Sequence, residues 1–376
     1  MINYGKHFID KADIKSVVNV LKSKNLTQGP VVKKFEKSIN NYFGSKYALV
    51  VSSGTSALYL AGKALGWNEK STIITSPLTF VAGANVSELM GSSVKFIDID
   101  PVTYCIDTKA LEIELKKNKK KITTVIATDF AGHTCDWKML KYLSTKYNFT
   151  LVNDNCHAVG AEYLGDQKYA VKYADLSTLS FHPVKHFTTG EGGAIFTNNF
   201  NLYNNLLLCR DHGILRKKNL WNYDVKFPSF NFRMCELQAS LGNSQIKKIN
   251  RFLKYRRDVA KIYDKELKDV KSITLPKSIN CKNAYHLYPI LINFRKLKKS
   301  KTKLLKIFLS NKIKLQVHYK PTHLFSYYLK KYKNNKKNLK ISEKFYKEEI
   351  SLPMFYNLKT KDVYKVIKIL KNFILN

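Results

Sequence analysis

Between residues 47 and 197 the apolar residues form short runs, and stretches with helical spacing of apolar and polar positions separate them. Short runs rich in β-branched and aromatic residues indicate strands. The predicted strands are residues 47–51, 72–75, 94–98, 124–127, 150–153, 175–179 and 193–197. Alternation of strands and helices is typical of a mainly parallel sheet that helices cover on both faces. The pattern therefore predicts an α/β fold.

Two amphipathic helices precede the first strand. Asp10 is the expected N-cap of the first helix, and residues 26–30 break it. Its apolar positions are Ile14, Val17, Val18 and Leu21. A second helix follows through residues 32–42, and Gly44 is expected to end it.

The remaining third of the chain follows a different pattern. The strand–helix rhythm stops near residues 210–213, and a helix with Leu237, Leu241 and Ile246 on one face is predicted next. A long basic helix, a strand-like run at 286–291 and further helices come after it. We therefore predict a large domain over residues 1–245 and a smaller α+β domain over residues 246–376.

The charge of the chain raises the question of a nucleic-acid partner. The 376 residues carry a formal net charge of +37, but only seven of the 65 basic residues are arginines. Base recognition relies on arginine, and no nucleic-acid motif is present. We interpret the lysines as a solvated basic surface, which attracts small anions such as nucleotide sugars. A nucleic-acid-binding or regulatory protein on the same fold is the alternative from a different class.

Composition limits the cellular setting. An apolar fraction of 44% and an aromatic fraction of 12% are typical of a folded globular protein. No apolar run is long enough to span a bilayer, and the first residues do not resemble a signal peptide. The six cysteines are widely spaced, without the pairing typical of zinc sites or disulfide frameworks. We expect a cytoplasmic protein with no metal site and no membrane partner.

Lys185 is the strongest candidate for chemistry. It lies in the polar connection 180–193 between two predicted strands, where a rigid scaffold can present a side chain. A serine, two histidines and the run Gly-Glu-Gly-Gly surround it in that connection. Most lysines are surface charges, but lysine is also the residue that forms Schiff bases with carbonyl ligands such as pyridoxal phosphate.

A second candidate feature is the turn Ser52–Ser56, which joins the strand 47–51 to a helix that begins near Ala57. Free backbone N–H groups and the helix dipole make such a turn an anion site. The turn is not a Walker loop, because the Gly-Lys-Ser/Thr ending is missing. Turns of this kind are common in α/β folds, so the motif alone is not specific.

Three further residues have two interpretations each. Asp154 is either a helix N-cap or a carboxylate that pairs with the pyridinium nitrogen of a bound cofactor. His157 either donates a hydrogen bond to the cofactor or is an ordinary histidine satisfied by the protein, and Phe80 either covers the cofactor ring or belongs to the core. All these candidates follow strands, and ligands of parallel sheets bind beyond the carboxyl ends of the strands.

Several of these segments together resemble one known family. They are residues 53–58, 77–80, 154–160, 180–185, 190–193 and 231–233, in this order and at suitable spacing. The combination is similar to the DegT/DnrJ/StrS nucleotide-sugar aminotransferases, and the resemblance covers nearly the whole chain. It implies fold type I of the pyridoxal-phosphate-dependent transferases, the architecture of aspartate aminotransferase.

The resemblance also implies roles for single residues. Lys185 would bind the cofactor covalently and move the proton between substrate and cofactor, and Asp154 would hold the pyridine nitrogen, with His157 also among the cofactor-binding residues. Phe80 would stack on the ring. The phosphate would be bound by Gly54, Thr55, Ser56 and Ser180, with Asn231 reaching the phosphate in the partner subunit of a homodimer. Lys185 argues against the branch of the family that has histidine there and performs dehydration.

The chain departs from the family pattern beside Asp154. Asn153 stands where an acidic residue is frequent, and Asn155 and Cys156 stand where small alanines are usual. These changes alter the surroundings of the cofactor without removing a catalytic group.

Within the family, residues 182–185, 286–290 and 316–321 most resemble a branch of pseudaminic acid biosynthesis. The implied reaction aminates C4 of a UDP-linked 4-keto-6-deoxy-N-acetyl hexose, with glutamate as donor and 2-oxoglutarate as its product. The residues assigned to substrate binding are Thr27, His182, His318 and Tyr319. Other nucleotide-linked keto sugars (dTDP or GDP), and amination at C3, stay open as alternatives.

Overall fold

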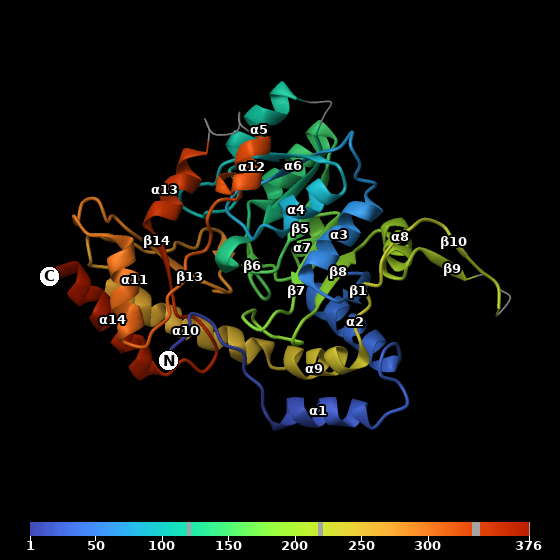
Figure 1. Cartoon of the computed structure of the whole chain (residues 1–376), viewed down its shortest axis with the longest axis horizontal. Helices are drawn as coiled ribbons and strands as arrows, with labels where there is room; N and C mark the ends of the chain where they lie inside the picture. Colours follow the sequence, from blue (N-terminus) through green and yellow to red (C-terminus); the bar gives the residue numbers. More distant parts are fainter. Residues whose placement is uncertain (119–121, 217–220, 333–338, 376) are drawn as a thin grey trace.

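The computed structural model describes residues 1–118, 122–216, 221–332 and 339–375. A seven-stranded sheet has the order β1-β8-β7-β5-β4-β2-β3. Figure 1 shows its strands β1, β8, β7 and β5 near the middle of the molecule. The strands are β1 (Tyr47–Val51), β2 (Thr72–Thr75), β3 (Ser93–Phe96), β4 (Ile122–Thr128), β5 (Thr150–Asp154), β7 (Leu176–Ser180) and β8 (Gly193–Thr197). β8 alone among these seven runs antiparallel to its neighbours β1 and β7. The predicted mainly parallel sheet is confirmed.

Helices cover both faces of this sheet. Residues alternate between the two faces along a strand, so Val50 of β1 joins one core, while Leu49 and Val51 join the other. The first core is covered by α2 (Pro30–Phe43), α5 (Thr108–Lys117), α6 (Trp137–Tyr147) and α9 (Glu236–Ile246). The second core is covered by α3 (Gly54–Ala64), α4 (Ala82–Leu89) and α8 (Phe200–Arg210). Burial of strands on both faces explains why they read as continuous apolar runs.

The last third of the chain builds a third core, separate from the two cores of the central sheet. It comprises buried residues between Val259 and Ile374, centred on the three-stranded sheet β11-β13-β14. Its elements are α10 (Ile249–Leu267), β11 (Ile273–Thr274), β13 (Tyr288–Ile292), α11 (Lys301–Ser310), β14 (Glu349–Leu352) and α14 (Thr360–Leu375). The start of α10 still packs in the first core through Phe252 and Leu253. The domain boundary near residue 245 stays a prediction.

Short elements complete the described chain. They are β6 (Glu162–Tyr163), α7 (Ala170–Tyr173), β12 (Cys281–Lys282), α12 (Ser326–Lys331), α13 (Lys340–Glu348) and the 3₁₀ turns Phe130–Gly132 and Thr322–Leu324. In the described ranges, no helix has the length and apolar character needed to cross a membrane.

Helix α1 (Lys11–Leu21) begins as predicted, with the Asp10 side chain accepting from the N–H groups of Ala12 and Asp13. Its apolar stripe is not covered, however: Ile14 is 57% exposed and Leu21 is 56% exposed. α1 buries Asp13 and Val20 instead, and it packs along α9 at the edge of the molecule (Figure 1). Sequence periodicity predicted the helix without revealing that its apolar side faces outward.

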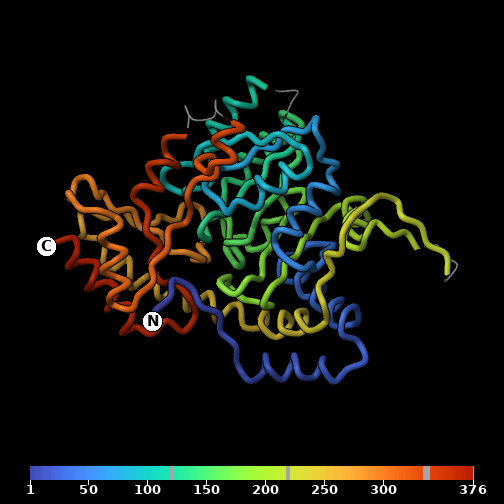
Figure 2. The backbone as a smooth tube through the Cα atoms, viewed as in Figure 1, coloured from blue at the N-terminus to red at the C-terminus, as the bar shows by residue number. Residues whose placement is uncertain are grey.

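The hairpin of β9 (Ile214–Arg216) and β10 (Tyr223–Val225) extends away from the body of the protein (Figure 2). Both strands carry exposed apolar side chains, including Leu215 and Tyr223. The hairpin replaces the strand–helix rhythm at the point where the sequence predicted a change.

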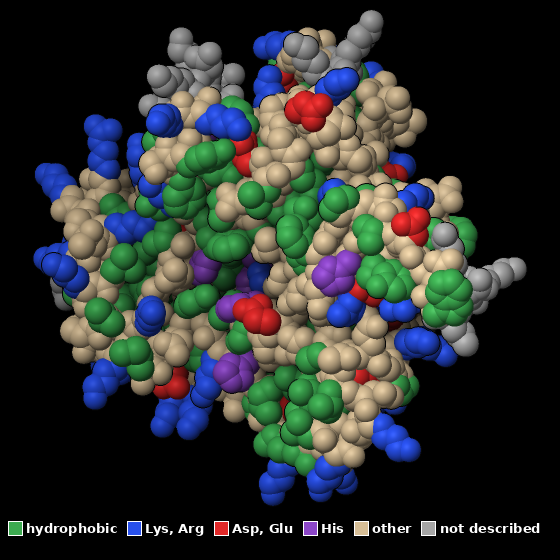
Figure 3. Space-filling model, turned by 45° about the vertical axis from the view of Figure 1, so that its right-hand side comes forward, with side chains coloured by type: hydrophobic (Ala, Val, Ile, Leu, Met, Phe, Trp, Pro, Cys, Tyr) green, Lys and Arg blue, Asp and Glu red, His purple; other side chains and the backbone are tan. Residues whose placement is uncertain are grey.

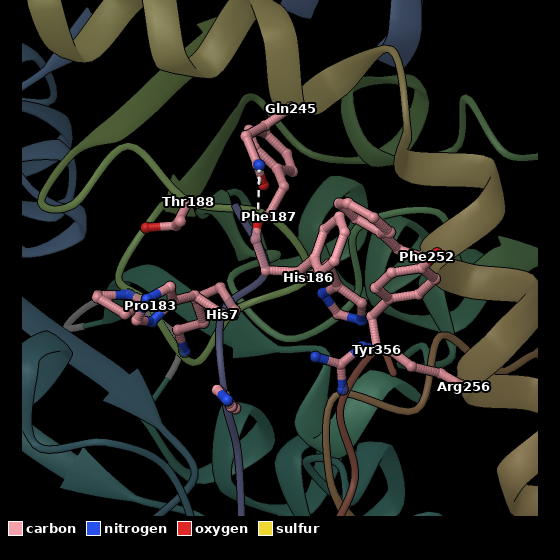
Figure 4. Close-up of a pocket in the computed structure, with 12 residues that line it drawn as sticks. His7, Pro183, His186, Phe187, Thr188, Gln245, Phe252, Arg256 and Tyr356 are labelled. Atoms are coloured by element: carbon pink, nitrogen blue, oxygen red, sulfur yellow. Dashed lines mark hydrogen bonds between the residues drawn. The ribbon is translucent and has the colours of Figure 1, made fainter. Parts of the chain in front are cut away.

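One buried arginine ties α10 to two other segments. The guanidinium of Arg256, only 1% exposed, donates to the carbonyl oxygens of Tyr285, His286 and Met354 at 3.1, 3.3 and 2.9 Å. Arg256 lines a small cavity of about 10 Å³. Figure 4 shows Arg256 in this cavity's lining, with His186 nearby. Charge-assisted hydrogen bonds are among the stronger ones, so these contacts fix the backbone just before β13 and just after β14.

Candidate active site

A cleft of about 500 Å³ lies at the edge of the sheet where the parallel strands end. Figure 3 shows a hollow near the centre of one face, with histidine side chains gathered at it. The predicted site residues that line the cleft are Gly54, Thr55, Phe80, Asp154, His157, Ser180, His182, Lys185, His318 and Tyr319. Residues from separate segments of the chain therefore meet here, as the rule for parallel sheets predicts.

Lys185 lies in the connection between β7 and β8, in a turn closed by its N–H, which donates to the His182 carbonyl oxygen at 2.9 Å. Burial lowers the pKa of the Lys185 amine below its ordinary value, while the negative charge of Asp154 acts in the opposite direction. In the described part of the chain no carboxylate lies within ion-pair distance of its Nζ. A larger neutral fraction makes the amine a better nucleophile.

Asp154 is the last residue of β5, and no helix begins after it, because the chain continues in turns to residue 160. The interpretation of Asp154 as a helix N-cap is therefore wrong. Its Oδ1 accepts from the Cys156 N–H at 3.2 Å, and its Oδ2 accepts weakly from the Thr128 hydroxyl at 3.5 Å. The carboxylate is held at the floor of the cleft and is half-buried.

His157 is buried and bonded at both ring nitrogens. Nδ1 accepts from the Ala131 N–H at 3.4 Å, so the proton of the neutral ring is on Nε2, which lies 3.3 Å from the Tyr319 hydroxyl. The His286 ring packs against it at a centroid distance of 4.3 Å. Both interpretations of His157 remain compatible with this geometry, since a ligand would replace only the contact with Tyr319.

The N-terminus of α3 enters the cleft between Ser53 and Ser180. The Ser53 hydroxyl caps the helix by accepting from the Ser56 N–H at 3.0 Å. The N–H groups of Gly54 and Thr55 have no acceptor within the helix, and both residues line the cleft. A Cβ at position 54 would lie 2.8 Å from the Ser180 Cβ, so the close approach requires glycine. This is the geometry of a phosphate site.

Phe80 is 58% exposed and lines the cleft with its ring 6.2 Å from that of Tyr319. The core interpretation of Phe80 is wrong, because an exposed aromatic face in a cleft is available to a ligand. Pyridoxal phosphate has a phosphate, an aromatic ring, a ring nitrogen and an aldehyde. The cleft offers an anion site for the phosphate, the open ring of Phe80, the carboxylate of Asp154 for the nitrogen and the desolvated amine of Lys185 for the aldehyde. The residues present therefore fit the cofactor implied by the family resemblance.

Three predicted residues lie outside the cleft. Ser56 is buried, and its hydroxyl is within 2.9 and 2.8 Å of the hydroxyls of Ser52 and Ser53. Thr27 and Asn231 are exposed, and neither lines the cleft of its own chain. The Asn231 Oδ1 accepts from the Arg233 N–H at 3.1 Å, which holds this side chain at the base of the hairpin.

The cleft also contains residues to which the sequence assigned no role, notably Tyr4, His286 and Gln316. His286 and Gln316 belong to two segments, 286–290 and 316–321, on which the family resemblance was based, so they could have been proposed as site residues from their position. No feature of the sequence near the N-terminus indicated that Tyr4 would reach the cleft.

The departures beside Asp154 have different structural roles. The Asn155 amide donates to Asp129 Oδ2 at 2.9 Å and to the Tyr169 hydroxyl at 2.8 Å, which makes it part of a buried network. Asn153 is fully buried in β5, and Cys156 lines the cleft. Burial raises the pKa of the Cys156 thiol well above its ordinary value. In the described residues, no group of His, Cys, Asp and Glu is arranged to hold a metal ion.

The fold and the cleft define an aminotransferase-like enzyme, and comparison with known proteins agrees. The family model of the DegT/DnrJ/EryC1/StrS aminotransferase family matches residues 7–371. The chain belongs to this family, and it is a fold type I aminotransferase.

Among its relatives, a UDP-4-amino-4,6-dideoxy-N-acetyl-β-L-altrosamine transaminase of Campylobacter jejuni is 40% identical over 363 residues, covering 96% of this chain and 94% of that protein. The structure of Helicobacter pylori PseC, an aminotransferase of pseudoaminic acid biosynthesis, superposes with a TM-score of 0.92 and 34% identity, covering 100% of this chain and 99% of that one. The pyridoxal-phosphate form of a sugar aminotransferase of Streptococcus pneumoniae gives a TM-score of 0.89 at 26% identity, covering 98% and 97%.

Four buried histidines surround the amine of Lys185 without carrying charge. Burial lowers the pKa of His157, His186 and His286 well below the ordinary value, and it lowers that of His318 to about 3. The positive charge of Lys185 lowers all four further. Because the rings protonate only on unfolding, the stability that they support is present above about pH 6.5 and is lost as pH falls below it.

We expect the free energy of unfolding to decrease between about pH 6.5 and 5, with each such histidine contributing up to about 1.4 kcal/mol per pH unit. His286→Asn should reduce this slope by about that amount, as measured by urea denaturation across the range. His182→Asn, at an exposed histidine, is the matched control and should leave the slope unchanged. An equal slope in wild-type protein and His286→Asn would contradict the assignment of a neutral histidine.

Proposed function

We propose that this enzyme transfers the amino group of glutamate to C4 of a UDP-linked 4-keto-6-deoxy-N-acetyl hexose, in the manner of pseudaminic acid biosynthesis, with pyridoxal phosphate as cofactor. The proposal is based mainly on one observation: a desolvated Lys185 amine and the Asp154 carboxylate line the same cleft. The reaction named for the Campylobacter jejuni relative supplies the substrate class.

Each part of the cofactor has a protein group assigned to it in this proposal. Pyridoxal phosphate, when bound, supplies an aldehyde that accepts the amino group and a ring that takes up electrons. The N–H groups of Gly54 and Thr55 and the Ser180 hydroxyl anchor the phosphate, and Asp154 keeps the ring nitrogen protonated. Phe80 covers one face of the ring. Lys185 holds and moves the proton at its Nζ, since its lowered pKa leaves that nitrogen able to accept one.

The sugar nucleotide is proposed to enter at the open side of the cleft. His182 lines the cleft and is exposed, and His318 and Tyr319 also line it, from the segment that follows Leu315. The neutral imidazole of His318 and the Tyr319 hydroxyl suit the hydroxyl and N-acetyl groups of a sugar, because they offer both donors and acceptors. The two phosphates of the nucleotide match the positive charge of the chain.

A homodimer completes the site in this proposal. The uncovered apolar stripe of α1 and the apolar side chains of the β9–β10 hairpin form surfaces that a second copy would bury. Asn231 lies at the base of the hairpin and outside its own cleft, as a residue contributed to the partner's site would. Thr27 is likewise exposed beyond α1.

Activity should depend on Lys185 and on one sugar class. Incubation with glutamate and a panel of UDP-, dTDP- and GDP-linked keto sugars should give an amino sugar from the UDP-linked 4-keto-6-deoxy-N-acetyl hexose, detected by mass. Lys185→Ala should lower the rate by at least about a thousandfold and abolish the absorbance band of the bound cofactor.

Lys254→Ala is the matched control for that experiment, because the Lys254 side chain is 82% exposed on α10. It should retain both the rate and the band. Full activity in Lys185→Ala would refute the role of the lysine, and product from a dTDP- or GDP-sugar alone would refute the substrate class.

Mixing two inactive variants tests the shared site. In a hybrid dimer of Lys185→Ala and Asn231→Ala, one site has both defects and the other has neither, if Asn231 serves the partner's cleft. Random exchange in an equal mixture should therefore restore about a quarter of the wild-type activity. No recovery, with hybrid dimers demonstrated by native mass spectrometry, would place Asn231 in its own subunit's site, and full activity of Asn231→Ala alone would place it outside any site.

A further inference from the structure

A chain of hydrogen bonds leads from a buried carboxyl group on β14 to the cleft. His318 lines the cleft and is only 4% exposed. Its Nδ1 lies 2.9 Å from the Ser351 hydroxyl, and its backbone N–H donates to Glu349 Oε2 at 3.0 Å. In the described part of the protein, no hydrogen bond to His318 Nε2 is formed, so this nitrogen is available to a ligand.

Ser351 connects the two ends of this chain. Its hydroxyl donates to Glu349 Oε1 at 2.6 Å, and Glu349 is fully buried. A hydroxyl has one proton, so Ser351 can donate in only one direction at a time. When it donates to the Glu349 carboxylate, its oxygen accepts from His318 Nδ1–H, and Nε2 presents a lone pair to the cleft.

Protonation of Glu349 reverses the direction of the hydrogen bonds that Ser351 forms with Glu349 and His318. The carboxylic acid then donates from Oε1 to Ser351, Ser351 donates to His318 Nδ1, and the ring proton resides on Nε2. The backbone N–H of His318 keeps its acceptor, Glu349 Oε2, in both states. The atoms of the three side chains need not move, because only protons change place.

The surroundings of these three side chains keep His318 neutral. Protonation of Glu349 therefore changes the tautomer of His318 and not its charge. Burial keeps His318 neutral by lowering its pKa to about 3. Burial also raises the pKa of Glu349, which the Ser351 hydrogen bond and the charge of Lys301 on α11 oppose. The other titratable groups close to Glu349 are Tyr104 and Tyr319, both neutral because burial raises their pKa.

We infer that Glu349 and Ser351 are positioning residues that set the tautomer of His318 and thereby its hydrogen-bonding partner on the sugar nucleotide. With Glu349 ionised, Nε2 accepts from a hydroxyl or from the N–H of the N-acetyl group. With Glu349 protonated, Nε2–H donates to a hydroxyl or to the N-acetyl carbonyl oxygen. This assignment of the ligand rests on the proposed function, whereas the tautomer is a property of the protein alone.

The substitution Glu349→Gln distinguishes the two tautomers of His318, because it allows only one of them. The amide oxygen can accept from the His318 N–H, and the amide NH₂ must then donate to Ser351, which fixes His318 as the Nε2–H tautomer at every pH. NMR of protein labelled with ¹⁵N-histidine reports the tautomer, and loss of signals in His318→Gln assigns the resonances. At alkaline pH we expect Nδ1–H in the wild-type protein and Nε2–H in Glu349→Gln.

At pH values below the titration of Glu349 the two proteins should converge on Nε2–H. Ser351→Ala, introduced into both the wild-type protein and Glu349→Gln, should remove the difference between them, while Ser351→Thr, which keeps the hydroxyl, should preserve it. Glu348→Gln, at the neighbouring end of α13, should leave the wild-type tautomer. The same tautomer in wild-type protein and Glu349→Gln at alkaline pH, with both folded by circular dichroism, would overturn the inference.

Kinetics then show whether the sugar nucleotide uses this face of His318. At alkaline pH, Glu349→Gln should raise KM for the sugar nucleotide about tenfold, the loss expected for one mismatched hydrogen bond, with a smaller effect on KM for glutamate. An equal change in both KM values would refute the role in sugar binding. Absence of amino transfer in the wild-type protein would refute the proposed function and leave the NMR result intact.

Discussion

The site depends on a half-buried lysine, Lys185, whose side chain lines the cleft with no carboxylate of the described residues within ion-pair distance. Lys185 loses solvation at the edge of the sheet, and the charge of Asp154 opposes this effect on its pKa without forming an ion pair in the described residues. An ion pair would hold the proton on Nζ, whereas burial alone would remove it. The balance of these two effects leaves an amine that can both attack a carbonyl and carry a proton.

The surroundings of Lys185 follow from the same constraint. The rings of His157, His186, His286 and His318 fill the interior beside it, and burial keeps them neutral. A charged imidazole at any of these positions would face the lysine, and at His186 and His286 also the buried guanidinium of Arg256. Arg256 directs its donors to backbone carbonyl groups, so it fixes the segment of His286 and the end of β14 relative to α10. The C-terminal part of the chain is thereby held against the cleft that it helps to build.

Local signals in the sequence predicted the sheet, the helix ends and most of the cleft. Strand residues are buried on both faces, so their apolar runs are unambiguous, and Asp10 and Gly44 cap their helices as expected. Residues at the ends of strands, such as Asp154 and Lys185, meet because parallel strands share an edge. The exposed side of α1, the position of Tyr4 at the cleft and the contact of Glu349 with His318 were not predictable. They depend on contacts between distant segments, and periodicity says that a helix has an apolar side without saying what covers it.

We expect the Lys185 amine alone, among the many lysines of the chain, to react with the cofactor. The reacting residue can be identified by adding pyridoxal phosphate, reducing the adduct with borohydride, and mapping the modified peptide by mass spectrometry. A single phosphopyridoxyl group is expected, on the peptide that contains Lys185. Modification at another lysine, or a distribution over the basic surface with Lys185 unmodified, would contradict it.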